Sequence, residues 1–200
     1  SQNMKYMRSS LFPGLINTLI HNLNNGLESQ KLFEIGSVFD VKTNKLTEKN
    51  KVSGLIYGNV TVDHWSDKPK KVTFYNVKGV VEKILSSFDL EINFASKSFE
   101  FFHTGISSAV FDGSKIIGYL GALSPIIIED LGLKQDVYLF SLDIDELKIR
   151  PVNKFKNFSK FPSIQRDLSF VVDKEVTGHE LTSLINAKAG SNIKSSSIFD

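Results

Sequence analysis

Cysteine is absent from this chain of 200 residues, so disulfide bonds and thiolate metal sites are excluded. No apolar run approaches the length of a membrane-spanning helix, and the N-terminus has no signal-peptide pattern. The net charge of +2 is too small to indicate nucleic-acid binding by itself. A hydrophobic fraction of 41% and a charged fraction of 23% are those of an ordinary globular protein. We therefore expect a globular, cytoplasmic protein with no membrane partner.

The motifs of common catalytic and cofactor sites are also missing. No two of the four histidines have i, i+4 spacing, so a zinc site on a helix is not expected. The glycines form no phosphate-binding loop, and no G-x-S-x-G elbow is present. His103 is interpreted as a structural hydrogen-bonding residue and His179 as a surface residue. Five neighbouring carboxylates are interpreted as solvated or capping charges: Glu129, Asp130, Asp143, Asp145 and Glu146. The residues alone therefore predict no catalytic, cofactor-binding or metal site.

The first part of the chain predicts a helix followed by an antiparallel hairpin. Ser10 is the expected N-cap, Pro13 is tolerated in the first turn, and Asn24-Asn25-Gly26 ends the helix. The apolar stripe of this helix consists of Leu15, Ile16, Leu19, Ile20 and Leu23. Strands are predicted over residues 31–40 and 52–57, with the polar residues 41–51 as the turn between them.

The middle of the chain predicts a second helix and several strands. An irregular segment, residues 60–73, contains Trp65 and the basic residues Lys68, Lys70 and Lys71. Asn76 is the expected N-cap of an amphipathic helix. Strands are then predicted over residues 91–95, 98–102, 107–111, 115–123 and 137–144, with a short helix at 125–131 and a helical turn at 145–148. Strands dominate and do not alternate regularly with helices, which favours an α+β fold with a mostly antiparallel sheet.

A second domain is expected after Arg150-Pro151, because proline restricts the preceding residue to extended geometry. We divide the chain into residues 1–152 and 153–200. A strand at 167–172, a helix opened by the Thr177–Glu180 capping box and a strand at 193–199 predict half of a ferredoxin-like fold. Since only one β-α-β half is present, we expect a fragment whose last segment is poorly ordered or paired with a neighbour.

Motifs in order along the chain resemble the beta chain of bacterial phenylalanyl-tRNA synthetase. Residues 7–15, MRSSLFPGL, are similar to the helix entry of that family. Further similar segments are residues 22–24, 32–36, Trp65 with 74–79, 103–105, 117–121, 124–125, 159–162 and 166–168. The resemblance implies a class II aminoacyl-tRNA synthetase-like antiparallel sheet flanked by helices up to about Arg150. The N-terminal part of a ferredoxin-like anticodon-binding domain follows.

The same resemblance implies a function that depends on a partner. In this family the alpha chain binds ATP and Mg²⁺ and performs aminoacylation, while the synthetase-like domain of the beta chain has no active site. That domain packs against the alpha chain in an α2β2 heterotetramer and supports aminoacylation of tRNA(Phe). The editing activity of the family belongs to a beta-chain module that nothing in this sequence resembles.

Arginine is missing from the two strands where a class II active site needs it. The family resemblance places motif 2 at residues 32–40 and motif 3 at residues 115–123, and neither contains arginine. No arginine occurs anywhere from Ile16 to Ile149. Guanidinium groups bind phosphate through fixed, bidentate donors that lysine does not offer. The sequence therefore predicts a non-catalytic domain within an ATP-dependent ligase.

Basic residues of the C-terminal segment are the candidate contacts to tRNA phosphates. They are Lys160, Arg166, Lys174, Lys188 and Lys194, with Arg166 the foremost. Two alternatives to the non-catalytic interaction domain stay open. One is a free-standing class II-like ligase domain that uses lysines to bind ATP. The other is an RNA-binding module built on residues 68–71 and the C-terminal half-domain.

Overall fold

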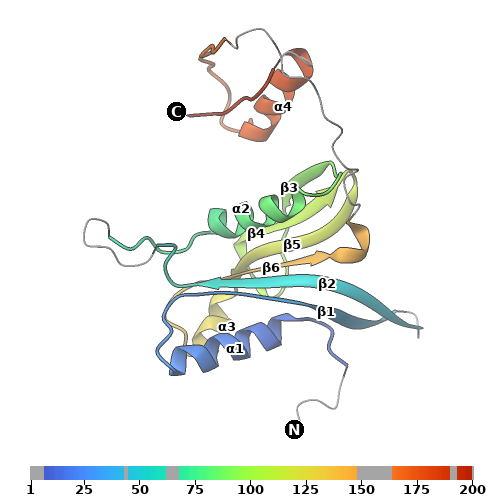
Figure 1. Cartoon of the computed structure of the whole chain (residues 1–200), viewed down its shortest axis with the longest axis vertical. Helices are drawn as coiled ribbons and strands as arrows, with labels where there is room; N and C mark the ends of the chain where they lie inside the picture. The colour runs from blue at the N-terminus through green and yellow to red at the C-terminus, as the bar shows by residue number, and fades with distance from the viewer. Residues whose placement is uncertain (1–6, 43–44, 62–67, 148–163, 190–192, 200) are drawn as a thin grey trace. The chain divides into compact units, whose positions relative to one another are not determined.

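The computed structural model describes residues 7–42, 45–61, 68–147, 164–189 and 193–199 (Figure 1). The chain forms two compact units, Ser1–Lys154 and Phe155–Asp200. The sequence-based boundary between residues 152 and 153 lies outside the described residues and stays a prediction. The helices and strands of the first unit are α1 (Phe12–Asn24), β1 (Gln30–Lys42), β2 (Lys45–Tyr57), α2 (Phe74–Leu85), β3 (Ile92–Ser96), β4 (Phe102–Asp112), β5 (Lys115–Leu123), α3 (Pro125–Asp130), β6 (Val137–Asp143) and the 3₁₀ turn η2 (Ile144–Glu146).

The strands of the first unit form one six-stranded sheet in the order β1-β2-β6-β5-β4-β3. Every neighbouring pair of strands is antiparallel. The last strand in sequence, β6, lies between β2 and β5 and joins the β1–β2 hairpin to the β3–β4–β5 meander. The predicted α+β class with an antiparallel sheet is therefore confirmed.

Helices cover both faces of this sheet, with α2 on one face and α1 and α3 on the other (Figure 1). Successive side chains of β6 enter opposite cores, because side chains alternate across a strand. Val137 and Leu139 pack on the α1 side, whereas Tyr138 and Phe140 pack on the α2 side. Apart from Leu11, the largest fully buried side chains come from the two cores: Leu19, Leu55, Leu85, Ile117, Leu120, Leu139, Leu142, Val77, Val81, Val110 and Val137. The central strands are thus closed on both faces.

Glycines let the large side chains of β6 fit on the α2 side. A Cβ atom at Gly54 of β2 would lie 2.3 Å from the ring of Phe140, the residue directly opposite it on β6. A Cβ at Gly118 would lie 2.5 Å from the carbonyl oxygen of Ser141 and 2.6 Å from a methyl carbon of Leu142. Both distances are far below van der Waals contact, so the two positions require glycine.

Helix α1 follows the sequence prediction closely. Its apolar residues Leu15 and Leu19 are buried, and Pro13 lies in its first turn. The N-cap position is Leu11, one residue after the predicted Ser10, although the Ser10 hydroxyl still accepts the Phe12 N–H at 3.2 Å. The helix ends before Gly26, which has a φ of 85°. That left-handed conformation explains why glycine follows the helix.

The N-cap of α2 was predicted at the wrong residue. Thr73 caps the helix, and Asn76 is its third helical residue. The Asn76 side-chain oxygen accepts hydrogen bonds from the Thr73 N–H at 2.8 Å and the Thr73 hydroxyl at 2.9 Å. This is the reciprocal role of the N3 residue in a capping box, where glutamate or glutamine is more common.

One predicted turn and one predicted strand differ from the structure. Strands β1 and β2 extend to Lys42 and Lys45, so the predicted turn at 41–51 was too long. Among the described residues of this distal part, none belongs to either core. The predicted strand at 98–102 is instead a turn that leads into β4 at Phe102. Its aromatic side chains cluster with α1 and β5 through Phe12, Phe99, Phe101, Phe102 and Tyr119.

In the second unit the described residues contain the helix α4 (Gly178–Ala189). The predicted capping box is confirmed, since Glu180 Oε2 accepts the Thr177 N–H at 2.8 Å and the Thr177 hydroxyl at 2.9 Å. The described residues form no strand at 167–172 or 193–199, contrary to prediction. Strands need pairing partners and a buried face, whereas Phe170 and Val171 are exposed.

Candidate functional site

A two-stranded arm projects from the sheet beyond the end of β6 (Figure 1). Strand β6 pairs with β2 only over Lys51–Tyr57, so residues 45–50 of β2 pair with β1 alone. We call residues 37–42 and 45–50 the hairpin arm. Apolar side chains near its tip, Val41 and Leu46, lie opposite each other and are exposed. An isolated two-stranded ribbon is marginally stable in water, so the arm needs support at its base.

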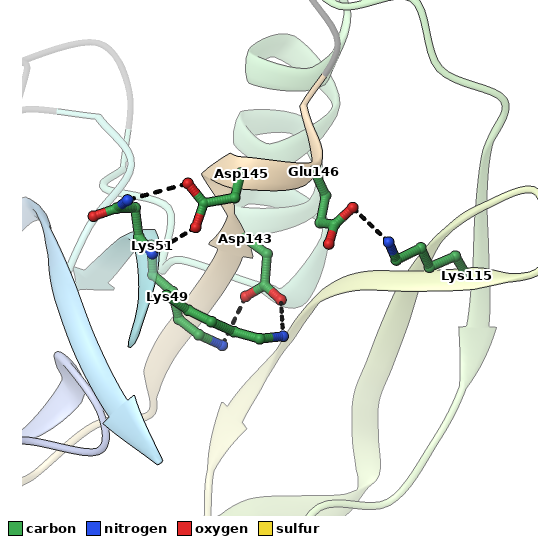
Figure 2. Close-up of polar contacts among 7 residues, drawn as sticks. Lys49, Lys51, Lys115, Asp143, Asp145 and Glu146 are labelled. Atoms are coloured by element: carbon green, nitrogen blue, oxygen red, sulfur yellow. Dashed lines mark hydrogen bonds and ion pairs between the residues drawn. The ribbon is translucent and has the colours of Figure 1, made fainter. Parts of the chain in front are cut away.

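Asp145 supplies part of that support from the turn η2. Its carboxylate accepts the backbone N–H of Asn50 at 2.9 Å and the side-chain N–H of Asn50 at 3.1 Å (Figure 2). The Asn50 side-chain oxygen in turn accepts the hydroxyl proton of Ser37 on the other strand of the arm, at 3.0 Å. The amide of Asn50 therefore links β1, β2 and the turn after β6.

Two ion-paired groups flank this link. Asp143 lies 2.8 Å from Lys51 Nζ and 3.3 Å from Lys49 Nζ, and Glu146 lies 2.5 Å from Lys115 Nζ (Figure 2). The side chains of Asp143 and Lys51 are only 14% and 15% exposed, so this pair is little screened by water. The sequence-based interpretation as solvated or capping charges therefore fits the exposed Asp145, which accepts a backbone N–H, and is wrong for the largely buried Asp143. Asp143 and Glu146 pair with lysines of strands that are distant in sequence, and Asp143 and Asp145 bind residues at the base of the arm.

Arg8 holds the outer side of the arm. Its Nε–H donates to the Ser37 carbonyl at 2.9 Å, its guanidinium pairs with Glu34 at 2.5 Å, and its own carbonyl accepts the Phe39 N–H at 2.8 Å. Planar guanidinium donors suit this combination of carbonyl and carboxylate acceptors. The arginine in the N-terminal motif thus has a structural position beside β1.

The Asp145–Asn50 link predicts a dependence of stability on pH. The two Asn50 hydrogen bonds lower the pKa of Asp145 below its usual value of 3.8, because they stabilise the ionised carboxylate. A lowered pKa in the folded state adds stability at pH values above 3.8, and this stability is lost as pH falls through the folded-state pKa. We expect Asp145→Asn to reduce the steepness of acid unfolding below pH 4, measured by circular dichroism. An equally steep acid transition in the variant would contradict this role.

A second feature is an open cavity of about 550 Å³ beside the N-terminus of α2. Aromatic residues, hydroxyls and one lysine line it: Thr73, Phe74, Tyr75, Lys78, Phe94, Ser96, Ser107, Ser108 and Tyr138 among them. Lys78 is already paired with Glu82 at 2.5 Å and lies 4.6 Å from the Phe94 ring centre. Burial, and then the nearby Asp136, raise the pKa of Tyr138, so its hydroxyl stays protonated at neutral pH. The described residues that line the cavity include no histidine or carboxylate that could activate one of its hydroxyls.

The predicted structural role of His103 is confirmed, since its Nδ1 accepts the Gly105 N–H at 3.0 Å. Of the other histidines, His64 and the side chain of His179 lie outside the described part of the chain, and His21 is exposed. Within the described residues, no group of three or more His, Cys, Asp and Glu is placed to hold a metal ion. No described helix combines the length and the apolar character needed to cross a membrane.

The candidate tRNA contacts all belong to the second unit. Arg166, Lys174, Lys188 and Lys194 are exposed in the second unit. Lys160 lies outside the described residues. These residues stay predictions.

The residues at the base of the arm were missed as a cluster by the sequence analysis. Asp145 and Asn50 are 95 positions apart, and their contact depends on the pairing of β2 with β6. The sequence offers one indication of this cluster: lysines alternate at Lys49 and Lys51, and the end of a later strand is acidic. That signal is interpretable only once the register is known.

Comparison with known proteins identifies two family models in this chain. Residues 1–144 match the model described as "Phenylalanyl tRNA synthetase beta chain CLM domain". Residues 159–200 match the model described as "Ferredoxin-fold anticodon binding domain". The second match supports the predicted ferredoxin-like class for the C-terminal segment, although the described residues there form no strands.

Curated relatives match over almost the whole chain. The phenylalanine–tRNA ligase beta subunit of Coxiella burnetii is 34% identical over 199 residues, which cover 98% of this chain and 25% of that protein. The beta subunit of Legionella pneumophila strain Lens is 33% identical over 202 residues, covering 100% of this chain and 26% of the relative. That of Staphylococcus aureus is 32% identical over 198 residues, covering 97% and 25%. The chain thus spans about a quarter of the length of these relatives.

Proposed function

Since this chain belongs to the phenylalanyl-tRNA synthetase beta-chain family, we propose that its first unit is a non-catalytic domain that packs against the catalytic alpha subunit of a phenylalanine–tRNA ligase. In the α2β2 assembly it supports aminoacylation of tRNA(Phe) in the cytoplasm. The observation that carries the proposal is a synthetase-like sheet whose motif 2-like and motif 3-like strands, β1 and β5, contain no arginine.

The packing of the sheet supports the absence of catalysis. Val77, Val81 and Leu85 of α2 are completely buried against one face, and α1 fills the other face. A nucleotide bound where these side chains pack would have to displace them, and close packing makes that costly. In the open cavity beside α2, the described lining residues offer phosphate one cation, Lys78, which is paired with Glu82. ATP and Mg²⁺ would therefore be bound by the alpha subunit, where the family keeps its catalytic residues.

Exposed apolar surface supports docking. Phe33 and Ile35 on the edge strand β1 are 73% and 62% exposed, whereas the cores of the unit are closed. Contiguous exposed apolar side chains on a globular protein commonly mark an interaction surface. The relatives are named beta subunits, which implies an alpha partner for them.

For the second unit we propose contacts with the phosphates of tRNA through the exposed Arg166, Lys174 and Lys194, together with Lys160. Such contacts release counterions from the RNA, so binding through them weakens as salt rises. The match of residues 159–200 to an anticodon-binding family supports this assignment.

The test is ATP–pyrophosphate exchange with phenylalanine, measured on the natural chain that contains these residues, on the alpha subunit, and on both together. We expect no exchange above background from this chain alone, exchange in the mixture, and co-sedimentation of the two chains. Robust exchange by the chain without the alpha subunit would instead establish a free-standing ligase. Failure to bind a cognate alpha subunit would reject the docking role.

A further inference from the structure

Three hydrogen bonds independently show which residues of β1 direct their backbone groups to the outer edge of the sheet. The Phe39 N–H donates outward to the Arg8 carbonyl, and the Ser37 carbonyl accepts outward from Arg8 Nε. On the opposite strand, the Asn50 N–H points away from β1 to Asp145, and Asn50 is the direct partner of Ser37. Along an antiparallel pair of strands, residues whose backbone groups point away from the partner strand alternate with residues that bond to it. The odd-numbered residues of β1 therefore direct their N–H and C=O groups outward.

By this alternation, Phe33 and Ile35 present backbone groups to the outer edge. Among the described residues, the backbone bonds to this edge come from Arg8, at Ser37 and Phe39, and none reaches residues 31–35. An edge with unpaired N–H and C=O groups is a template for another strand.

The side chains of the same residues lie on the α2 side of the sheet. Phe33 pairs with Gly54, which faces the Phe140 ring, and Ile35 pairs with Val52, which packs against the α2-side core. Helix α2 does not reach this margin, since the Phe33 and Ile35 side chains are 73% and 62% exposed. The free backbone and the free apolar side chains thus belong to the same two residues.

We propose that residues 31–35 of β1 accept an extended segment of the alpha subunit as an added β-strand. The incoming strand supplies main-chain partners for Phe33 and Ile35, and its apolar side chains cover theirs. Alternate apolar residues are the chemistry that this recognition mode requires. Lys31, which is exposed and has the same orientation, favours an acidic residue at one end of the segment. The inference rests on the proposed function, because it names where that partner binds.

The size of the edge argues against a second copy of this chain as the occupant. Five residues of strand extend only about 17 Å. Pairing two copies over this length buries far less than the roughly 1,200–2,000 Å² of a stable interface. A subunit that touches this chain elsewhere as well does not have this limitation, because its other contacts contribute to binding.

The first test is hydrogen–deuterium exchange of the natural chain, alone and in complex with the alpha subunit. We expect the amides of Phe33 and Ile35 to exchange fast in the chain alone and at least about tenfold more slowly in the complex. Unchanged exchange in a complex that has formed overturns the strand proposal but leaves the proposed function intact. Protection already present in the chain alone, from its own residues or from a second copy, also overturns it. Failure of the complex to form rejects the proposed function itself.

The second test uses Phe33→Lys with Ile126→Lys as its matched control. Ile126 lies on α3 and is 71% exposed, close to the 73% of Phe33, so both variants place a lysine at an exposed apolar position. We expect Phe33→Lys to raise the Kd for the alpha subunit about tenfold or more, and Ile126→Lys to change it less than about twofold. Circular dichroism confirms folding of both variants. Equal affinities of the two folded variants would overturn the proposal.

Discussion

Replacing Gly118 with valine is expected to cost about 3 kcal/mol or more of the free energy of unfolding of the first unit. The new Cβ would meet the Ser141 carbonyl oxygen at 2.5 Å and Leu142 Cδ2 at 2.6 Å, before the valine methyl groups are added. The carbonyl belongs to the neighbouring strand β6 and is held by the sheet, so relief requires separation of β5 from β6.

The matched control for this prediction is Gly79→Ala in α2. A Cβ at Gly79 has no heavy atom within 4 Å beyond its own helix and chain neighbours, and the residue is exposed. Alanine favours the helix over glycine, so the control should gain about 0.5–1 kcal/mol. Urea unfolding monitored by far-UV circular dichroism measures the free energy of unfolding of both variants. A Gly118→Val variant within 1 kcal/mol of the wild type would show that β5 and β6 separate easily.

Leu19→Ala is expected to destabilise the first unit by about 2–5 kcal/mol, because it removes buried methyl groups and leaves a cavity. Leu19 is completely buried in α1, where it packs in the cluster with Leu55 and Leu139. The backbone carbonyl of Leu19 also accepts the side-chain N–H of Gln30 at 3.3 Å, and this bond joins α1 to the start of β1. Loss of packing there should loosen α1 from the sheet.

Leu27→Ala provides the control of the same chemistry at a position that is 55% exposed. It should change the free energy of unfolding by less than about 0.5 kcal/mol. Chemical denaturation of the two variants gives the difference directly. Equal losses at both positions would mean that burial of α1 contributes little to the fold, contrary to the packing described above.

Local patterns in the sequence predicted the regular elements of the first unit well. Strand β5 has the predicted bounds of residues 115–123, since turn residues flank an apolar run on both sides. Helix α1 and the capping box at Thr177 were also evident, because caps and turns depend on neighbouring residues. The N-cap of α2 was misplaced because Asn76 fits both the N-cap and the N3 position.

Features that depend on strand pairing were not predictable in this way. Residues 41–42 and 45–50 of the arm were predicted as turn, because these stretches lack the buried alternation that identifies strands inside a core. The contacts of Asp143 and Asp145 require β6 to lie beside β2, and no local pattern gives that order. The strands expected at 167–172 and 193–199 do not form in the described residues, because local β-propensity does not replace a pairing partner.

The central position of β6 has a consequence for synthesis on the ribosome. The strands on its two sides are made earlier, and their inner edges stay open until the residues up to Asp143 have left the exit tunnel. Until then β2 and β5 each offer an unpaired edge to any other nascent or misfolded chain. Chaperone capture should therefore be strongest just before β6 emerges. A stop codon shortly upstream of Val137 should yield an aggregation-prone product rather than a smaller folded domain.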